Sequence, residues 1–165
     1  MRFIYSRFRC VFFLYAYLLI SGSAFAQTKP CMFCLIAHGK VPLSQIVYKD
    51  SSVLAFMDHA PDNPGHVLVI PLVHAKEIIE IPDSTARNML SVARRIAIAI
   101  KKTDIKADGF RLQINSGEAA GQDVLHCHLH VIPRYVGETL NVKNIKVPQG
   151  ELEETARKIR EALYP

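Results

Sequence analysis

Short hydrophobic runs alternate with polar segments in the first half of the chain, and this pattern predicts three β-strands. The β-branched and aromatic runs Ile46–Tyr48 and Val53–Met57 are separated by a polar segment that suits a hairpin turn. A third run, His66–Ile70, follows a proline-rich loop and is closed by Pro71. Ahead of these strands, residues 31–38 predict one helical turn.

The second half of the chain predicts one long helix followed by two more strands. Residues 83–102 carry apolar side chains at helical spacing, with Asp83 or Ser84 as the expected N-cap. The runs Gly109–Ile114 and Leu125–Ile132 predict strands joined by a glycine-containing loop.

A last helix is predicted over residues 150–163, where Glu153/Arg157 and Glu154/Lys158 form pairs four positions apart. Strands and helices do not alternate regularly along the chain, so a parallel βαβ arrangement is not expected. We therefore predict an α+β fold with a largely antiparallel five-stranded sheet, one long central helix and a C-terminal helix.

Residues 1–26 have the pattern of an export signal. Three arginines precede the apolar run Val11–Ile20, and Ala24–Ala26 offers small residues for cleavage before Gln27. Because the apolar run is short for a membrane span of about 20 residues, we expect cleavage rather than stable membrane insertion. The expected product is a single domain, residues 27–165, that is periplasmic or secreted.

The net charge of the chain does not indicate a particular class of binding partner. The formal net charge of +5 falls to +2 once the three arginines of the predicted signal are removed. No cluster of Lys and Arg interleaved with aromatic residues follows, so a nucleic-acid groove is not indicated. A ligand the size of a nucleotide stays compatible with this composition.

Three of the seven histidines alternate within the segment His126–His130. In a regular strand their rings share one face, and the outer two Cα atoms lie roughly 13 Å apart, too far for one metal ion. Neighbouring rings, about 6.6 Å apart at Cα, can instead bracket a phosphate, with one attacking phosphorus and another donating hydrogen bonds. A hydrogen-bond acceptor on the second nitrogen of the attacking ring would fix its reactive tautomer.

Several ordered motifs resemble those of the histidine triad family, and together they span about residues 30–136. They are Cys31-x-x-Cys34, Val53–Asp58, Asn63–Pro71 with His74 after it, and Gly121–Tyr135. The resemblance implies a homodimer of α+β subunits that binds nucleotides. It also implies hydrolysis or transfer of a nucleoside monophosphate through a nucleotidyl-histidine intermediate, from a phosphoramidate, a dinucleoside polyphosphate or a nucleotidyl ester.

The resemblance assigns roles to individual residues. It makes His128 the nucleophile, with His130 bonding phosphate oxygens and His66 completing the catalytic cluster. It places Asp58 at the ribose hydroxyls, and it places Gln122 and Asn115 at the phosphate or the leaving group, with His126 also among the substrate-binding candidates. Asp123 departs from the pattern, because some branches of the family have Ser or Thr there. Either Asp123 points away from the phosphate, or the leaving group differs in this chain.

A candidate Cys2His2 set is formed by Cys31, Cys34, His74 and His126. It resembles the zinc ligands of zinc-bearing members of the family. We expect a structural zinc ion there, with no organic cofactor. The second interpretation is a disulfide between the two cysteines in an oxidising compartment. The third is a redox-catalytic cysteine pair. Cys127 is expected in the core. The competing functions are a nucleotide-binding module without catalysis and an exported zinc-binding protein.

Overall fold

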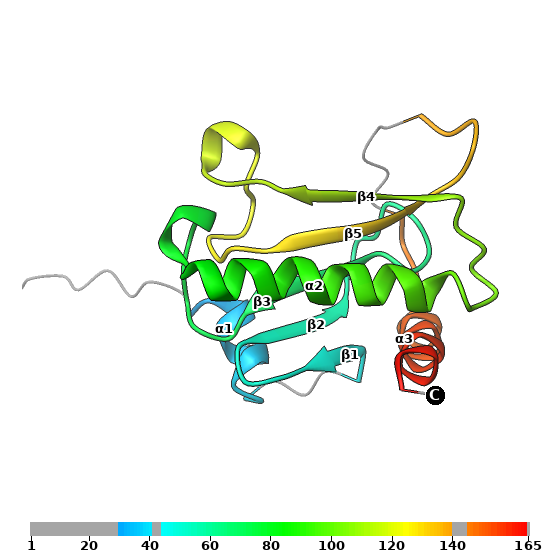
Figure 1. The fold of residues 1–165 in the computed structure, drawn as a ribbon, viewed down its shortest axis with the longest axis horizontal. Coiled ribbons are helices and arrows are strands. Elements are labelled where there is room, and N and C mark those ends of the chain that lie inside the picture. The colour runs from blue at the N-terminus through cyan, green and yellow to red at the C-terminus, as the bar shows by residue number, and fades with distance from the viewer. Residues whose placement is uncertain (1–29, 41–43, 140–144, 165) are drawn as a thin grey trace, which may run out of the picture.

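The computed structural model describes residues 30–40, 44–139 and 145–164. The elements in chain order are α1 (Met32–Ala37), β1 (Ile46–Lys49), β2 (Val53–Met57), β3 (Val67–Pro71), the 3-10 turn η1 (Ile78–Glu80), α2 (Asp83–Ile100), β4 (Gly109–Ile114), the 3-10 turn η2 (Glu118–Ala120), β5 (Leu129–Arg134) and α3 (Gln149–Leu163) (Figure 1).

The five strands form one antiparallel sheet in the order β1-β2-β3-β5-β4. This confirms the predicted α+β class and the five-stranded sheet. β2 and β3 lie in the interior, and all their residues are buried, which agrees with their nearly continuous apolar runs.

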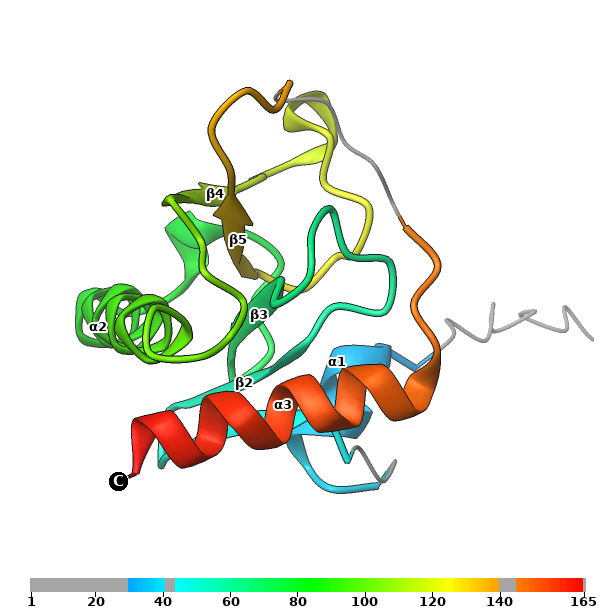
Figure 2. The same cartoon turned by 90° about the vertical axis from the view of Figure 1, so that its right-hand side faces the viewer.

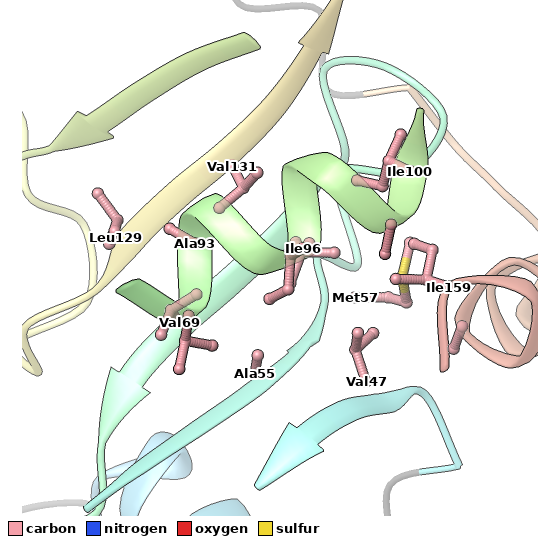
Figure 3. Close-up of a cluster of buried hydrophobic side chains, with 14 of the residues drawn as sticks. Val47, Ala55, Met57, Val69, Ala93, Ile96, Ile100, Leu129, Val131 and Ile159 are labelled. Atoms are coloured by element: carbon pink, nitrogen blue, oxygen red, sulfur yellow. The ribbon is translucent and has the colours of Figure 1, made fainter. Parts of the chain in front are cut away.

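The main hydrophobic core lies between the sheet and α2. Helix α2 crosses one face of the sheet, and α3 runs past the β1 edge (Figures 1 and 2). The buried residues of α2 recur every three or four positions, as predicted. Figure 3 shows Ile96 of α2 among side chains of the sheet, with Ile159 of α3 beside Met57 of β2.

The opposite face of the sheet is covered by the short helix α1 (Figure 2). Phe33 and Ile36 of α1 pack on Phe56 and Leu68, which alternate along β2 and β3 with the side chains that meet α2. Because α1 has only six residues, part of this face is left open, and the candidate site lies there.

Some predicted boundaries were wrong. β5 begins at Leu129 rather than Leu125, so of the three alternating histidines only His130 lies in the strand. Neither Asp83 nor Ser84 caps α2, since the N-cap position is Pro82 without a side-chain bond.

The predicted ion pairs of the last helix also differ from those observed. Arg157 bonds Glu154 and Glu161, and Lys158 bonds Asp104, in place of the i,i+4 pairs expected from the sequence. The predicted export signal lies outside the described residues. Among the helices that the structure describes, none is long and apolar enough to cross a membrane.

Candidate active site

A cleft of about 780 Å³ opens on the sheet face that carries α1. It collects residues that the sequence predicted for catalysis and substrate binding, although they lie far apart along the chain: Asp58, His66, Asn115, His128 and His130. Gln122 and His126 do not line the cleft. The walls add apolar side chains from α1, β2 and β3, so the cleft combines a histidine cluster with an apolar compartment.

The main chain fixes the hydrogen-bonding state of His128. Its Nδ1 lies 2.7 Å from the backbone oxygen of His126. A carbonyl oxygen can only accept, so Nδ1 carries the proton and donates it. In the neutral ring Nε2 therefore keeps its lone pair, which is the form that can attack phosphorus. The ring of Phe33 packs edge-on against His128, with centroids 5.5 Å apart, and limits its rotation.

A chain of hydrogen bonds sets the tautomers of the other two histidines. The backbone N–H of Asp62 donates to Nδ1 of His66 at 3.1 Å, so the proton of neutral His66 is on Nε2. That Nε2–H lies 3.0 Å from Nδ1 of His130 and donates to it. His130 therefore carries its own proton on Nε2. Its ring lies 4.8 Å from that of His128 between centroids, so this N–H can reach a ligand at the nucleophile.

Burial favours the neutral form of both rings. The pKa of His130 is lowered to about 4, mainly by burial and further by the neighbouring His66 and His128. The pKa of His66 is also lowered, again mainly by burial, although the carboxylates of Asp58 and Asp62 act in the opposite direction. At neutral pH the pair can thus serve as a hydrogen-bond relay without carrying charge.

Asp58, His66 and His130 also bring three potential metal ligands together. The hydrogen bond from Asp62 argues against a metal ion at this place. Because Nδ1 of His66 accepts an N–H, its Nε2 holds the proton of the neutral ring and has no lone pair for a metal. The group is therefore better suited to hydrogen-bonding a ligand in the cleft than to holding a metal ion.

Asp58 stands where β2 ends, beside the histidine pair. Its Oδ2 lies 3.5 Å from Nε2 of His66, and its Oδ1 accepts the backbone N–H of Ala60 at 2.9 Å. Each carboxylate oxygen can accept further bonds, so the side chain can still receive hydroxyl groups from a ligand.

The loop between β4 and β5 is held by its own side chains. Gln122 is buried, with its Oε1 accepting from the backbone of Gly117 and its Nε2 donating to the carbonyls of Lys76 and Val124. Its amide is therefore already occupied. Asn115 lines the cleft and donates to the carbonyl of Gly121 at 3.1 Å. Gly121 needs to be glycine here because its φ is +77°.

Asp123 is exposed and lines the cleft. This placement does not agree with an Asp123 that points away from the cleft, and it leaves the second interpretation from the sequence, in which the leaving group differs. A second anion at this position would be repelled, because like charges a few ångströms apart raise each other's energy.

A separate cluster of side chains that could hold a metal ion lies behind the histidines. The ligand atoms of Cys31, Cys34, His74 and His126 all lie within 4.8 Å of one another. The Nδ1 of His74 is 3.2 Å from the sulfur of Cys34 and 3.4 Å from Nδ1 of His126, and His126 Nδ1 is 3.5 Å from both sulfurs. Both cysteines are free thiols, without a disulfide between them.

These distances suit a tetrahedral ion. With bonds of about 2.3 Å to sulfur and about 2.0–2.1 Å to nitrogen, tetrahedral zinc ligands lie about 3.3–3.8 Å apart. His126 is prepared for this role, because its Nε2 donates to the carbonyl of Pro71 at 3.0 Å and leaves Nδ1 facing the cluster. With both ring nitrogens engaged, His126 belongs to the metal cluster and offers no ring atom to a substrate.

The sequence did not identify several residues that build the site. Phe33 packs against both His126 and His128, Asp62 sets the tautomer of His66 through its backbone, and Gln45 and Met32 line the cleft. The position of Phe33 between two cysteines was the one signal for it. Almost any residue type could make the main-chain contact of Asp62, so the sequence gives no signal for it.

Comparison with known proteins agrees with this geometry. The model of the HIT (histidine triad) domain matches residues 40–137. An uncharacterized HIT-like protein of Methanocaldococcus jannaschii is 38% identical over 130 residues, which cover 79% of this chain and 98% of that protein. A protein of Arabidopsis thaliana named adenylylsulfatase is 39% identical over 104 residues, 63% of this chain and 52% of its own length.

Among solved structures, a zinc-bound histidine triad family protein from Mycobacterium smegmatis is similar with a TM-score of 0.73 and 38% identity. The match covers 81% of this chain and 93% of that one. The fold, the family model and these relatives agree, and the chain belongs to the HIT domain family, whose members are generally nucleotide hydrolases and transferases.

Proposed function

We propose that this protein hydrolyses or transfers a nucleoside monophosphate through a covalent intermediate on His128. The observation that carries the proposal is the bond from Nδ1 of His128 to the carbonyl of His126, which puts the proton of the neutral ring on Nδ1 and leaves the lone pair on Nε2. A binding module without catalysis has no need of a nucleophile held in its reactive tautomer.

In the first step, Nε2 of His128 forms a bond to phosphorus, and the bond from phosphorus to the leaving nitrogen or oxygen breaks. The leaving group keeps the electron pair and takes a proton from solvent. The ring becomes an imidazolium, and the carbonyl of His126 stabilises it by accepting its Nδ1–H. His130 donates its Nε2–H to a phosphate oxygen. Water then forms a bond to phosphorus and loses a proton to solvent, while the bond from phosphorus to Nε2 breaks and its electron pair returns to the ring. This releases the nucleoside monophosphate and restores neutral His128.

Asp58 is the proposed partner of the ribose hydroxyls, because its carboxylate lines the cleft beside the histidines. For Asn115 we propose contact with the phosphate side of the ligand. Gln122 is proposed to act indirectly, by holding the loop of Gly117 and Gly121 in shape. The relative named adenylylsulfatase supports an adenylyl group as the transferred unit.

The leaving group is proposed to be an amine rather than an anion. The carboxylate of Asp123 lines the cleft, and it would repel a departing polyphosphate more than a departing amine. A nucleoside 5′-phosphoramidate therefore fits the site better than a dinucleoside polyphosphate.

The test measures AMP release from adenosine 5′-phosphoramidate and from diadenosine polyphosphate by the wild type and by His128→Ala. We expect a higher kcat/KM for the phosphoramidate, and a loss of at least about a thousandfold in the variant, because the nucleophile itself is removed. Quenched-flow samples with labelled substrate should contain protein-bound adenylate in the wild type alone.

If the two proteins release AMP equally slowly while calorimetry shows nucleotide binding to both, the protein is a binding module and catalysis by His128 is wrong. Equal kcat/KM values for the two substrates would instead remove the proposed role of Asp123.

We further propose that Cys31, Cys34, His74 and His126 hold one structural zinc ion. The ligand spacing and the zinc-bound relative support it. When bound, the ion would cross-link the chain segments that carry its four ligands. A protein that stores zinc would need several ions per chain, whereas this cluster provides one closed tetrahedral set.

A further inference from the structure

Apart from the histidines, the lining of the cleft has an apolar part and a polar part. Phe33, Ile36, Phe56 and Leu68 supply the apolar surface, which suits a flat ring system. Ser44, Gln45 and Gln149 supply the polar groups. Of these, Ser44 and Gln149 both donate to the carboxylate of Glu153, so their donor groups already have a partner.

Gln45 differs from its neighbours. Its side chain is 2% exposed and lines the cleft, and its Oε1 has no hydrogen-bond donor among the residues that the structure describes. A buried amide oxygen without a donor costs free energy, and such groups are rare in folded proteins. A ligand with an N–H at this position would remove that cost.

The backbone places Gln45 in line with the rest of the site. The carbonyl of Gln45 accepts the N–H of Met57, the residue before Asp58. Ile46, Phe56, Leu68 and His130 are direct neighbours across β1, β2, β3 and β5. With strands about 4.8 Å apart, this row measures about 14 Å. That length suits a ligand with its phosphate at His130, its ribose at Asp58 and its base near Gln45.

We propose that Gln45 is the residue that selects the base, by accepting a hydrogen bond from the 6-amino group of adenine. This inference rests on the proposed function of the cleft. Adenine carries an N–H donor next to a ring-nitrogen acceptor, and a glutamine amide matches that pair in the way it does in DNA recognition. The apolar walls hold the rings, and Gln45 distinguishes bases that fill the same space.

The experiment compares adenosine 5′-phosphoramidate with purine riboside 5′-phosphoramidate, which has the same ring system without the 6-amino group. We expect the wild type to prefer the adenosine compound by about tenfold in kcat/KM, because its counterpart leaves Oε1 unpaired. Gln45→Met keeps the length of the side chain and removes the amide. In this variant the ratio should fall close to one, through loss of activity on adenosine alone.

A wild type without preference overturns the proposal, as does an equal loss on both substrates in Gln45→Met, since a purely structural role affects both. The affinities of AMP and purine riboside 5′-monophosphate, measured by calorimetry, should show the same tenfold ratio. If neither phosphoramidate is turned over, the proposed function fails, but the ratio of these two affinities still decides the role of Gln45.

Discussion

The proposed contact of His130 with phosphate depends on the neutral state of its ring. A protonated His130 would donate from Nδ1 as well, and the bond from His66 to that atom would be lost. The structure resists this protonation by burying the ring, which lowers its pKa to about 4. The same burial has a consequence for stability.

Between pH 6.5 and about 4, an unfolded chain protonates His130 and the folded protein does not, because the unfolded pKa is about 6.5. The unfolded state binds more protons, so the free energy of unfolding must decrease as the pH falls through this range. The slope is at most about 1.4 kcal/mol per pH unit for one proton. We expect His130→Gln to show a shallower slope in urea titrations of the zinc-saturated protein.

His38→Gln is the matched control, because His38 is exposed and lies outside both clusters. It should follow the wild-type curve. Parallel curves for wild type and His130→Gln would show that His130 is not held neutral by the fold.

Much of the element structure could be predicted from the sequence. Strands β2 and β4 and the buried stripe of α2 follow directly from local periodicity. The start of β5 could not be predicted, because a contact distant in sequence decides it. Pro71 has no N–H for the ladder, and its carbonyl accepts from the ring of His126. Cys127 then bonds Ala75, so the chain joins the ladder only at Leu129.

The residues of the candidate site also fall into those that the sequence could predict and those that it could not. Residue types with distinctive chemistry, such as the histidines and the cysteine pair, were visible in the sequence, and the structure brings them into two clusters. Gln45 and Gln122 show the limit of this approach. Oε1 of Gln45 has no donor among the described residues, whereas the amide of Gln122 has three partners, and only tertiary packing makes that difference.

The proposed zinc ion would tie together α1, the segment after β3 and the segment before β5. We expect one zinc ion per chain in the wild type, measured by mass spectrometry of the native protein. Cys34→Ser should lose most of the metal and lower the midpoint of thermal unfolding by about 5–10 °C, because bound metal stabilises the folded state alone. Activity should fall as well, since His126 positions His128.

The control is again His38→Gln, which should keep its zinc. Full zinc content in Cys34→Ser, or several ions per wild-type chain, would contradict a single Cys2His2 site.

At the scale of the whole molecule, β4 leaves one edge of the sheet without a neighbouring strand in the described chain. An open edge is a place where a second chain can add. Leu112 of β4 is 42% exposed, and Leu90 and Ile98 of α2 are exposed as well. We propose that the homodimer expected from the family resemblance forms along β4.

Sedimentation equilibrium tests this assembly. The wild type should sediment as a dimer, and Leu112→Glu should shift it to monomer at micromolar concentration, because a charge would be buried in the interface. Ile79→Glu, at an exposed position on η1, serves as the control and should stay dimeric. A monomeric wild type, or a dimeric Leu112→Glu, would exclude this interface.

The acceptor that holds His128 in its reactive form belongs to the backbone of His126, not to its side chain. Every amino acid carries such a carbonyl, so no point substitution at position 126 can delete it. In descendants of this protein, the metal cluster can therefore decay while the nucleophile keeps its tautomer, provided that other packing holds the loop. Under the two proposed roles, catalysis depends on the path of the chain at position 126, and metal binding depends on the imidazole ring.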